Sequence, residues 1–200
     1  MIMLAPLDEV KEFLEITGPQ FDDMINHLIV RVSSSMESYV NRNLKLEQRT
    51  AYFNSNRRLM FLSAYPVDMA QTFTFLWDNV IQPVDKFWLY VWADVGKVEW
   101  FRQPLFVQPK EISITWSGGY EASCVTYDGT NQNILLAVPD DLKDACIMQT
   151  SYNFRRRRDI GVWSVRTNDG VVQNYRIRGG QWLPEVKSIL DGYRKTPSEV

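Results

Sequence analysis

Residues 138–158, VPDDLKDACIMQTSYNFRRRR, hold a complete helix signal and decide the fold. Pro139 and the two aspartates after it can start and cap a helix, and apolar side chains then recur every three or four residues. The inner stripe of this helix consists of Leu142, Ala145, Cys146, Gln149 and Tyr152. Because a helix with one apolar stripe cannot bury it alone, the sequence predicts that this helix packs against others.

Three further segments have a helical rhythm. Residues 7–15 (LDEVKEFLE) and residues 21–41 are separated by a short break, TGP, which predicts an antiparallel pair. Residues 183–195 (LPEVKSILDGYRK) supply a last, short helix. The first two apolar stripes consist of Leu7, Val10, Phe13 and Leu14, and of Phe21, Met24, Ile25, Leu28, Ile29, Val32, Met36 and Tyr39. The expected core of the four-helix bundle consists of Leu7, Val10, Leu14, Ile25, Leu28, Val32, Leu142, Cys146, Ile189 and Leu190.

Between these helices, apolar residues recur at every second position, as in a β-strand. The alternation is clearest in residues 111–120, EISITWSGGY, where Gly118 and Gly119 are expected to form a turn after the strand. Similar runs separated by Pro, Gly and Asn predict five or six antiparallel strands. Five of the seven tryptophans lie at residues 77–116, and we expect most of these rings in a β core and some as surface anchors in an assembly. The predicted fold class is α+β, a small bundle of about four helices interrupted by an antiparallel β insertion.

These changes of rhythm divide the chain into three parts. Residues 1–47 hold the N-terminal helical pair, residues 48–138 hold the β insertion, and residues 139–200 hold the C-terminal helices of the bundle. Residues 159–181 contain four glycines among polar residues, which predicts a long mobile loop.

The composition is that of a globular protein with unevenly distributed charge. Of the 200 residues, 45% are apolar and 23% are charged, and the net charge is −2. Residues 1–138 carry five more acidic than basic side chains, whereas residues 139–200 carry three more basic than acidic ones. Such polarity suits a protein that meets different neighbours at its two ends. Because no basic leader and no long apolar run is found, we expect a soluble chain without signal peptide or membrane span.

No motif with catalytic or cofactor chemistry stands out in the sequence. His27 is the only histidine and lies within a helix, which favours a structural or surface role. Cys124 and Cys146 lack metal-ligand spacing and indicate a reducing cytoplasm by default, although a disulfide between them stays open. Phosphate loops and nucleophile elbows are absent from the sequence, so we expect no enzyme, no metal and no cofactor. A hydrolase with an aromatic-lined site would need two facing carboxylates. The candidates for such a pair are Asp78, Asp85, Asp94 and Glu99.

Four consecutive arginines end the central helix. Positive charge at a helix C-terminus favours the helix dipole, but four adjacent arginines splay around every face and exceed what a cap requires. Three hypotheses stay open: docking against acidic groups of another chain, contact with DNA phosphates without reading sequence, and a solvated helix end. The contact candidates are Arg155, Arg156, Arg157, Arg158, Arg176, Arg178 and Trp182.

Several motifs along the chain occur in a characteristic order. They are LDEVK (7–11), YVNR (39–42), LSAYPV (62–67), GKV (96–98), ITWSGGY (114–120) and VPDDLKDA (138–145). Together they resemble the head–tail connector (adaptor, or head-completion) proteins of tailed bacteriophages, in a member with a long β insertion. The resemblance covers residues 7–158 and the last helix.

The resemblance implies a structural virion protein that works without turnover or cofactor. Copies would form a ring, twelve-fold by the resemblance, under the portal protein, extend the DNA channel and hold the stopper or tail-completion protein. The expected location is the head–tail interface of the virion, and the host cytoplasm during assembly, with no membrane partner. The alternative function is a small DNA-binding regulator that uses the basic C-terminal segment, and it predicts salt-sensitive binding of duplex DNA by the monomer.

Overall fold

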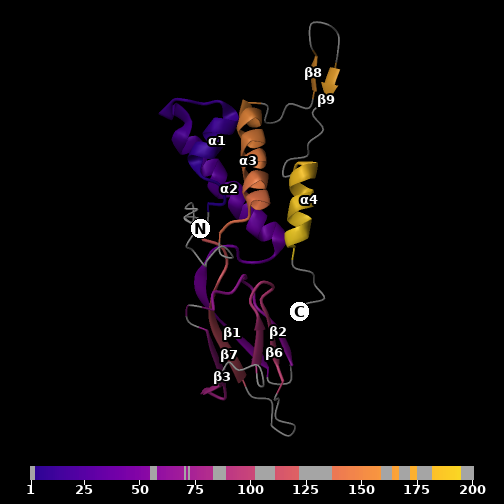
Figure 1. The fold of residues 1–200 in the computed structure, drawn as a ribbon. Coiled ribbons are helices and arrows are strands. Elements are labelled where there is room, and N and C mark those ends of the chain that lie inside the picture. The colour runs from indigo at the N-terminus through magenta and orange to yellow at the C-terminus, as the bar shows by residue number, and fades with distance from the viewer. Residues whose placement is uncertain are drawn as a thin grey trace. The chain divides into compact units, whose positions relative to one another are not determined.

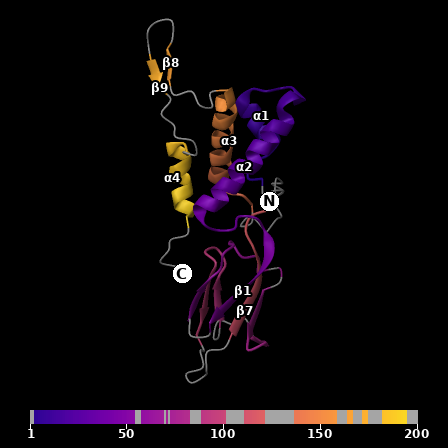
Figure 2. The ribbon, with the colours of Figure 1, turned by 180° about the vertical axis from the view of Figure 1, so that it is seen from behind.

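The chain divides into two compact units that are described one at a time (Figures 1 and 2). A helical unit comprises Met3–Val40 and Pro139–Tyr193, and a β unit comprises Asn41–Val138. The β unit thus begins at Asn41, seven residues before the expected start. The computed structural model describes residues 3–54, 58–69, 71, 73–82, 89–101, 111–121, 137–158, 164–166, 172–174 and 182–194.

The helical unit contains the four predicted helices. They are α1 (Leu7–Leu14), α2 (Asp22–Val40), α3 (Asp140–Arg155) and α4 (Pro184–Tyr193), with single 3-10 turns η1 (Pro19–Phe21) before α2 and η3 (Arg156–Arg158) after α3. Helix α3 packs against each of the other three helices, so it forms the centre of the bundle (Figure 1). In the part of the chain that the structure describes, every helix is too short or too polar to span a bilayer.

Local signals set the ends of these helices. Helix α1 ends where Glu15 enters the left-handed region, with φ 59° and ψ 37°. Helix α3 starts from Pro139, which is the N-cap and makes no side-chain capping bond because its ring has no acceptor, so neither Asp140 nor Asp141 is the N-cap. Both aspartates instead lie in the first turn, where their charge favours the helix dipole, and Asp141 Oδ1 accepts a hydrogen bond of 2.8 Å from the Leu142 amide.

The expected bundle core lies on the inner faces of these helices. The buried members are Val10, Ile25, Val32, Leu142, Cys146 and Leu190, and the half-buried ones are Leu7, Leu14, Leu28 and Ile189. Phe13 and Met24, expected on the same stripes, are instead 51% and 43% exposed. At about 100° per residue, Phe13 is about 100° from Leu14 around α1, so it lies at the edge of the stripe.

Cys146 has a free thiol in the core of the helical unit. Its Sγ lies 3.6 Å from Ser33 Oγ, and Ser33 Oγ in turn accepts a 3.1 Å hydrogen bond from the Leu4 amide. Burial raises the pKa of the Cys146 thiol, because the apolar surroundings disfavour a thiolate. The open disulfide with Cys124 is therefore not made by this thiol, and Cys124 itself lies outside the described residues.

The raised pKa of Cys146 predicts a loss of stability at alkaline pH. The folded state keeps the thiol proton at pH values where the unfolded chain releases it, so the stabilisation is complete below the unfolded pKa of about 8.5. It is lost as the pH rises from there through the folded pKa, by up to about 1.4 kcal/mol per pH unit. We expect urea unfolding to show this fall for the wild type relative to Cys146→Ala between about pH 8 and 10. A pH-independent difference between the two proteins would contradict the prediction.

The β unit contains two antiparallel sheets. The larger sheet has the order β1-β7-β3-β4, and its strands are β1 (Glu47–Asn54), β7 (Glu111–Gly118), β3 (Thr74–Trp77) and β4 (Val80–Gln82). The smaller sheet has the order β2-β6-β5, and its strands are β2 (Leu59–Phe61), β6 (Lys97–Trp100) and β5 (Leu89–Trp92). Four helices and these antiparallel sheets confirm the predicted α+β class.

The described residues of the β unit hold seven strands where five or six were predicted. The sequence singled out the runs that form β2, β3, β5, β6 and β7, but neither β1 nor β4, and β4 follows β3 after only two residues, Asp78 and Asn79. Both residues have positive φ, 53° and 61°, as the tight hairpin turns that match strand twist require. Because Asp and Asn tolerate this conformation, the hairpin forms without glycine.

The two sheets share one apolar core. Its buried members include Phe75 of the larger sheet and Val98 and Trp100 of the smaller one, and the rings of Phe75 and Trp100 meet edge to face at 5.6 Å. Trp116 is 1% exposed and donates a 2.9 Å hydrogen bond from Nε1 to the Ala64 carbonyl, so its polar atom is satisfied. These tryptophans lie in the β core, as the sequence predicts for most of the rings.

Gly118 and Gly119 do not form the expected turn. Gly118 ends β7 opposite Glu47, and the next residue lets the chain pass against the Leu44–Lys45 backbone. A Cβ on Gly119 would lie 2.5 Å from the Lys45 carbonyl, and its φ of 114° is one that other residues rarely adopt. Gly119 therefore allows the close approach of the Leu44–Lys45 backbone, and Gly118 allows that of the Ala64 carbonyl, from which a Cβ would lie 2.5 Å.

We expect Gly119→Ala to destabilise the protein by at least about 1–3 kcal/mol, because it adds both a clash and backbone strain. Thermal unfolding followed by circular dichroism measures the loss. Gly18→Ala is the matched control, since a Cβ there meets nothing within 4 Å. Equal melting temperatures for the two variants would show that the contact with the Leu44–Lys45 backbone tolerates a side chain at residue 119.

Residues 159–181 are not wholly a loop. Within them, β8 (Ser164–Arg166) and β9 (Val172–Asn174) pair antiparallel, with Val165 opposite Gln173. Each of these strands has only three residues and a single valine, Val165 or Val172, so the surrounding glycines and polar residues predicted a loop.

Candidate assembly interface

The arginine-bearing end of α3 is partly built into the helical unit. Arg157 places its guanidinium 3.8 Å from the ring centroid of Phe154 and 5.3 Å from that of Phe21. Its Nη1 also donates a 2.6 Å hydrogen bond to the Phe154 carbonyl, one of the carbonyls left open where the helix ends. Arg157 thus closes the end of α3 by stacking and by capping.

Arg155 and Arg156 differ in how they are held. Arg156 donates a 2.6 Å hydrogen bond to the hydroxyl of Tyr152, one turn earlier. Arg155 is exposed, and no ion pair or hydrogen bond of its guanidinium occurs among the residues that the structure describes. Of the three arginines in the run whose side chains the structure describes, Arg155 is therefore the most available to another molecule. The side chain of Arg158 and all of Arg176 and Arg178 lie outside the described residues.

Trp182 lies where α4 meets α2. Its half-buried ring meets Tyr39 edge to face at 5.9 Å, and the Tyr39 hydroxyl donates a 2.6 Å hydrogen bond to Asp191 of α4. Tyr193 makes a matching 2.6 Å bond to Asp141 of α3. Trp182, predicted as a contact with another chain, is thus engaged in attaching α4 to the bundle.

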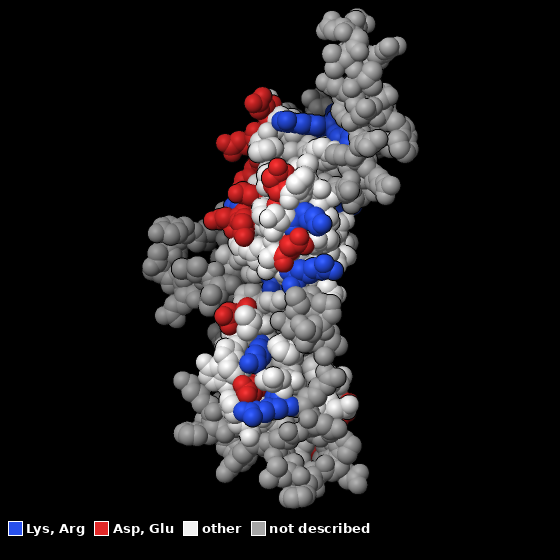
Figure 3. Space-filling view, turned by 90° about the vertical axis from the view of Figure 1, so that its right-hand side faces the viewer, with Lys and Arg blue, Asp and Glu red and all other residues white. Residues whose placement is uncertain are grey.

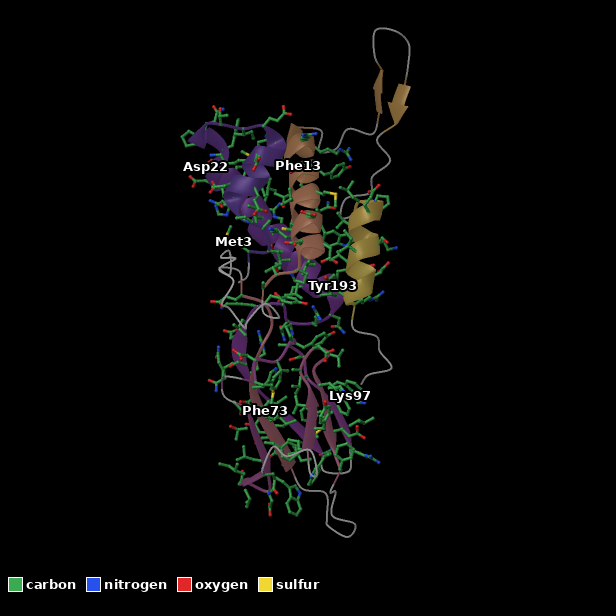
Figure 4. All side chains as sticks on the ribbon, viewed as in Figure 1. Met3, Phe13, Asp22, Phe73, Lys97 and Tyr193 are labelled. Carbon is green, nitrogen blue, oxygen red and sulfur yellow. The ribbon has the colours of Figure 1, made fainter. Side chains whose placement is uncertain are left out.

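A groove of about 480 Å³ runs between α1 and α3. Its lining residues are Glu9, Glu12, Phe13, Asp144, Ile147 and Met148. Figure 4 labels Phe13, which lies on this side of α1 beside α3. Lys143 lies 3.4 Å from Glu9 and offsets its charge, whereas no ion pair of Glu12 or Asp144 occurs within the described part of the chain. The groove therefore combines an apolar floor with an acidic rim.

Acidic side chains gather along one edge of the helical unit. In Figure 3 they lie in the upper half of the view, with basic side chains at the upper end of the unit and also further down beside acidic ones. The acidic residues of α1 and of the first turns of α3 are Asp8, Glu9, Glu12, Asp140, Asp141 and Asp144. The groove was not predicted, because the helical spacing placed Phe13 on the apolar stripe of residues 7–15, although the acidic residues around that phenylalanine were a signal for it.

The β unit exposes apolar side chains at the β3–β4 hairpin and on β1. Val80 and Ile81 of β4 are 59% and 70% exposed, and Tyr52 of β1 is 67% exposed. Strands β1 and β4 are the two edges of the larger sheet. Exposed apolar residues on sheet edges suit contact with other chains.

The carboxylates proposed for a hydrolase do not form a facing pair among the described residues. Asp78 and Asp94 are exposed, and Glu99 lies between Arg58 and Lys97, at 3.0 Å and 4.0 Å. Asp85 lies outside the described residues, and His27 is exposed on α2. No group of three metal-ligating side chains occurs in the ranges that the structure describes. The described surface of both units therefore offers binding features, namely charged groups, stacking rings and apolar sheet edges.

The family model of the head completion protein (HCP) matches residues 3–196, nearly the whole chain. The chain belongs to the head completion protein family. This membership confirms the resemblance seen in the sequence and assigns this head completion protein a structural role in head–tail connection. A comparison with curated proteins gives no significant match.

Solved structures support the fold of this head completion protein. It is similar to a chain in the neck of an empty GTA particle computed with C6 symmetry, with a TM-score of 0.56 and 16% sequence identity. A chain in the neck of a native GTA particle computed with C12 symmetry gives a TM-score of 0.56 at 14% identity. A chain in the virion of a native gene transfer agent (GTA) particle gives 0.55 at 16% identity. Each comparison covers 96% of this chain and 90% of the other.

We expect Arg157→Ala to destabilise this head completion protein by about 1 kcal/mol or more, because it removes a stacked cation and a hydrogen bond. Arg155→Ala, the matched control on the same helix, should change stability by less than about 0.5 kcal/mol. Urea unfolding followed by circular dichroism compares the two. Equal losses would mean that Arg155 is as much a part of the folded unit as Arg157.

Proposed function

We propose that copies of this head completion protein assemble into a ring in the neck of a tailed virion. The ring lies between the portal protein and the stopper or tail-completion protein, and DNA passes through its centre. The protein then acts by shape and surface complementarity, with no catalytic turnover.

The observation that carries this proposal is the family match over residues 3–196. The solved structures most relevant here are virion necks computed with C6 and C12 symmetry. Both symmetries suit the twelve-fold ring that the sequence resemblance implies, because a twelve-fold ring also obeys sixfold symmetry. Closed rings of identical subunits are a usual outcome of head-to-tail contacts.

The surfaces of the chain support a role in assembly. The groove between α1 and α3, the arginine-bearing end of α3 and the exposed edges of the larger sheet give one subunit several unlike patches. A ring subunit needs at least two complementary patches for its neighbours and others for the parts above and below. Arg155 is the arginine best suited to contact another chain, since Arg156 and Arg157 already bind within the subunit.

The DNA-binding regulator has no support in the family or in the solved structures. Non-sequence-specific contact of the arginine end with packaged DNA remains compatible with a neck ring, because phosphate contacts need no base reading.

Electron microscopy of the purified full-length chain, mixed with the portal protein of the same virion, tests the proposal. We expect rings, alone or seated on the outer end of the portal, at near-physiological salt. The matched sample is the chain without portal at the same concentration, which shows whether ring formation needs the portal.

Two results would overturn the proposal. One is a chain that stays monomeric and does not bind the portal at any concentration tested. The other is tight, salt-sensitive binding of duplex DNA by the monomer, with a steep fall of affinity between 50 and 200 mM salt, on the order of a thousandfold or more.

A further inference from the structure

We propose that the groove between α1 and α3 receives the arginine-bearing end of α3 from the neighbouring copy of this chain. This contact would be the lateral joint of the ring, and it rests on the proposed function. It identifies an acceptor surface for the exposed Arg155, which has no ion pair or hydrogen bond of its guanidinium among the described residues of its own subunit.

The groove has the chemistry of an arginine site. Glu12 and Asp144 place two exposed carboxylates on its rim, on α1 and α3, and no cation of the described residues pairs with either. Phe13 adds a ring that is 51% exposed, over a floor of Ile147 and Met148. A guanidinium binds carboxylates through its planar fork and stacks on aromatic faces, so the groove satisfies both of its preferences.

The same chemistry already operates inside the subunit. The guanidinium of Arg157 stacks on Phe154, and that of Arg42 lies 4.1 Å from the ring centroid of Tyr65. Arg155 is the member of the run that is exposed and has no such ring among the described residues. We infer that Arg155 stacks on Phe13 of the next copy, as Arg157 stacks on Phe154 within its own subunit.

The arginine end comes from a second copy because the arginine end of a subunit does not reach the acidic rim of its own groove. Asp144 and Arg155 lie on one straight helix, eleven residues apart, which is about 16 Å at 1.5 Å per residue. Donor and acceptor patches on different parts of one surface make a head-to-tail contact, and repetition of that contact closes a ring when the rotation permits. The negative rim excludes DNA as the occupant, since phosphates and carboxylates repel.

A charge-exchange experiment tests this joint. Glu12→Arg places a cation on the groove and leaves the arginine end intact, whereas Arg155→Glu places an acid on the arginine end and leaves the groove intact. Each variant alone opposes like charges at every joint. Because both positions are exposed, circular dichroism should show wild-type folding for both variants.

We expect each variant alone to need at least about tenfold higher concentration than the wild type for half-maximal ring formation, since like charges at an interface are strongly unfavourable. An equimolar mixture of the two variants should restore rings. When the two variants alternate around the ring, every joint pairs opposite charges. Arg155 meets Glu12 at one joint, and the two substituted side chains meet each other at the next. Mass photometry and electron microscopy measure rings, with the portal present if the wild type requires it.

Matched controls use exposed charges on α4, which contributes to neither patch, Glu185→Arg and Lys187→Glu. These should assemble as the wild type does. Normal rings from both groove and arginine-end variants would overturn the proposed joint while leaving the neck ring intact. Normal rings that no longer bind the portal would assign the groove to the portal, which also overturns the joint. A wild type that never forms rings, with or without the portal, would instead contradict the proposed function itself.

Discussion

The burial of α3 on three sides is the constraint on which the helical unit depends. Its inner residues, among them Leu142, Ala145 and Cys146, are fully buried, and α1, α2 and α4 each pack against it. None of these short helices would be stable in water alone, so their order comes from the shared core. The same packing fixes both ends of the proposed joint, because the groove and the arginine end are each formed along α3. A change in the core of α3 would therefore disturb both surfaces together.

Helix spacing in the sequence was enough to predict the four helices and the α+β class. Residues in the middle of an apolar stripe, such as Val10 and Ile25, lie in the core, because the neighbouring helices cover the face that the helical spacing defines. Whether a residue at the edge of a stripe is buried depends on how far the neighbouring helix covers it. Phe13 therefore became part of a surface groove, and only the packed structure shows it.

The sequence predicted that the β unit consists of antiparallel strands, but it did not predict the order in which they pair. The alternation in residues 111–120 predicted a long strand, and β7 lies there, but the pairing order β1-β7-β3-β4 depends on contacts distant in sequence. Gly118 and Gly119 had the residue types of a turn, and only the structure shows that they make room for the Ala64 carbonyl and the Lys45 backbone. The charges were similarly ambiguous. Four arginines in a row do not reveal that Arg157 stacks on Phe154 whereas Arg155 stays exposed.

The insertion of the β unit between α2 and α3 has a consequence for synthesis on the ribosome. When α2 emerges, its buried face, including Ile29 and Met36, has only α1 to pack against until residues 41–138 and then α3 have also been translated. At about 5–20 residues per second this delay is roughly 5 to 20 s. A β unit that completes its own core within that time leaves α1 and α2 as the exposed, sticky part of the nascent chain. Molecular chaperones would then meet this protein at its N-terminal helices, before α3 arrives to cover them.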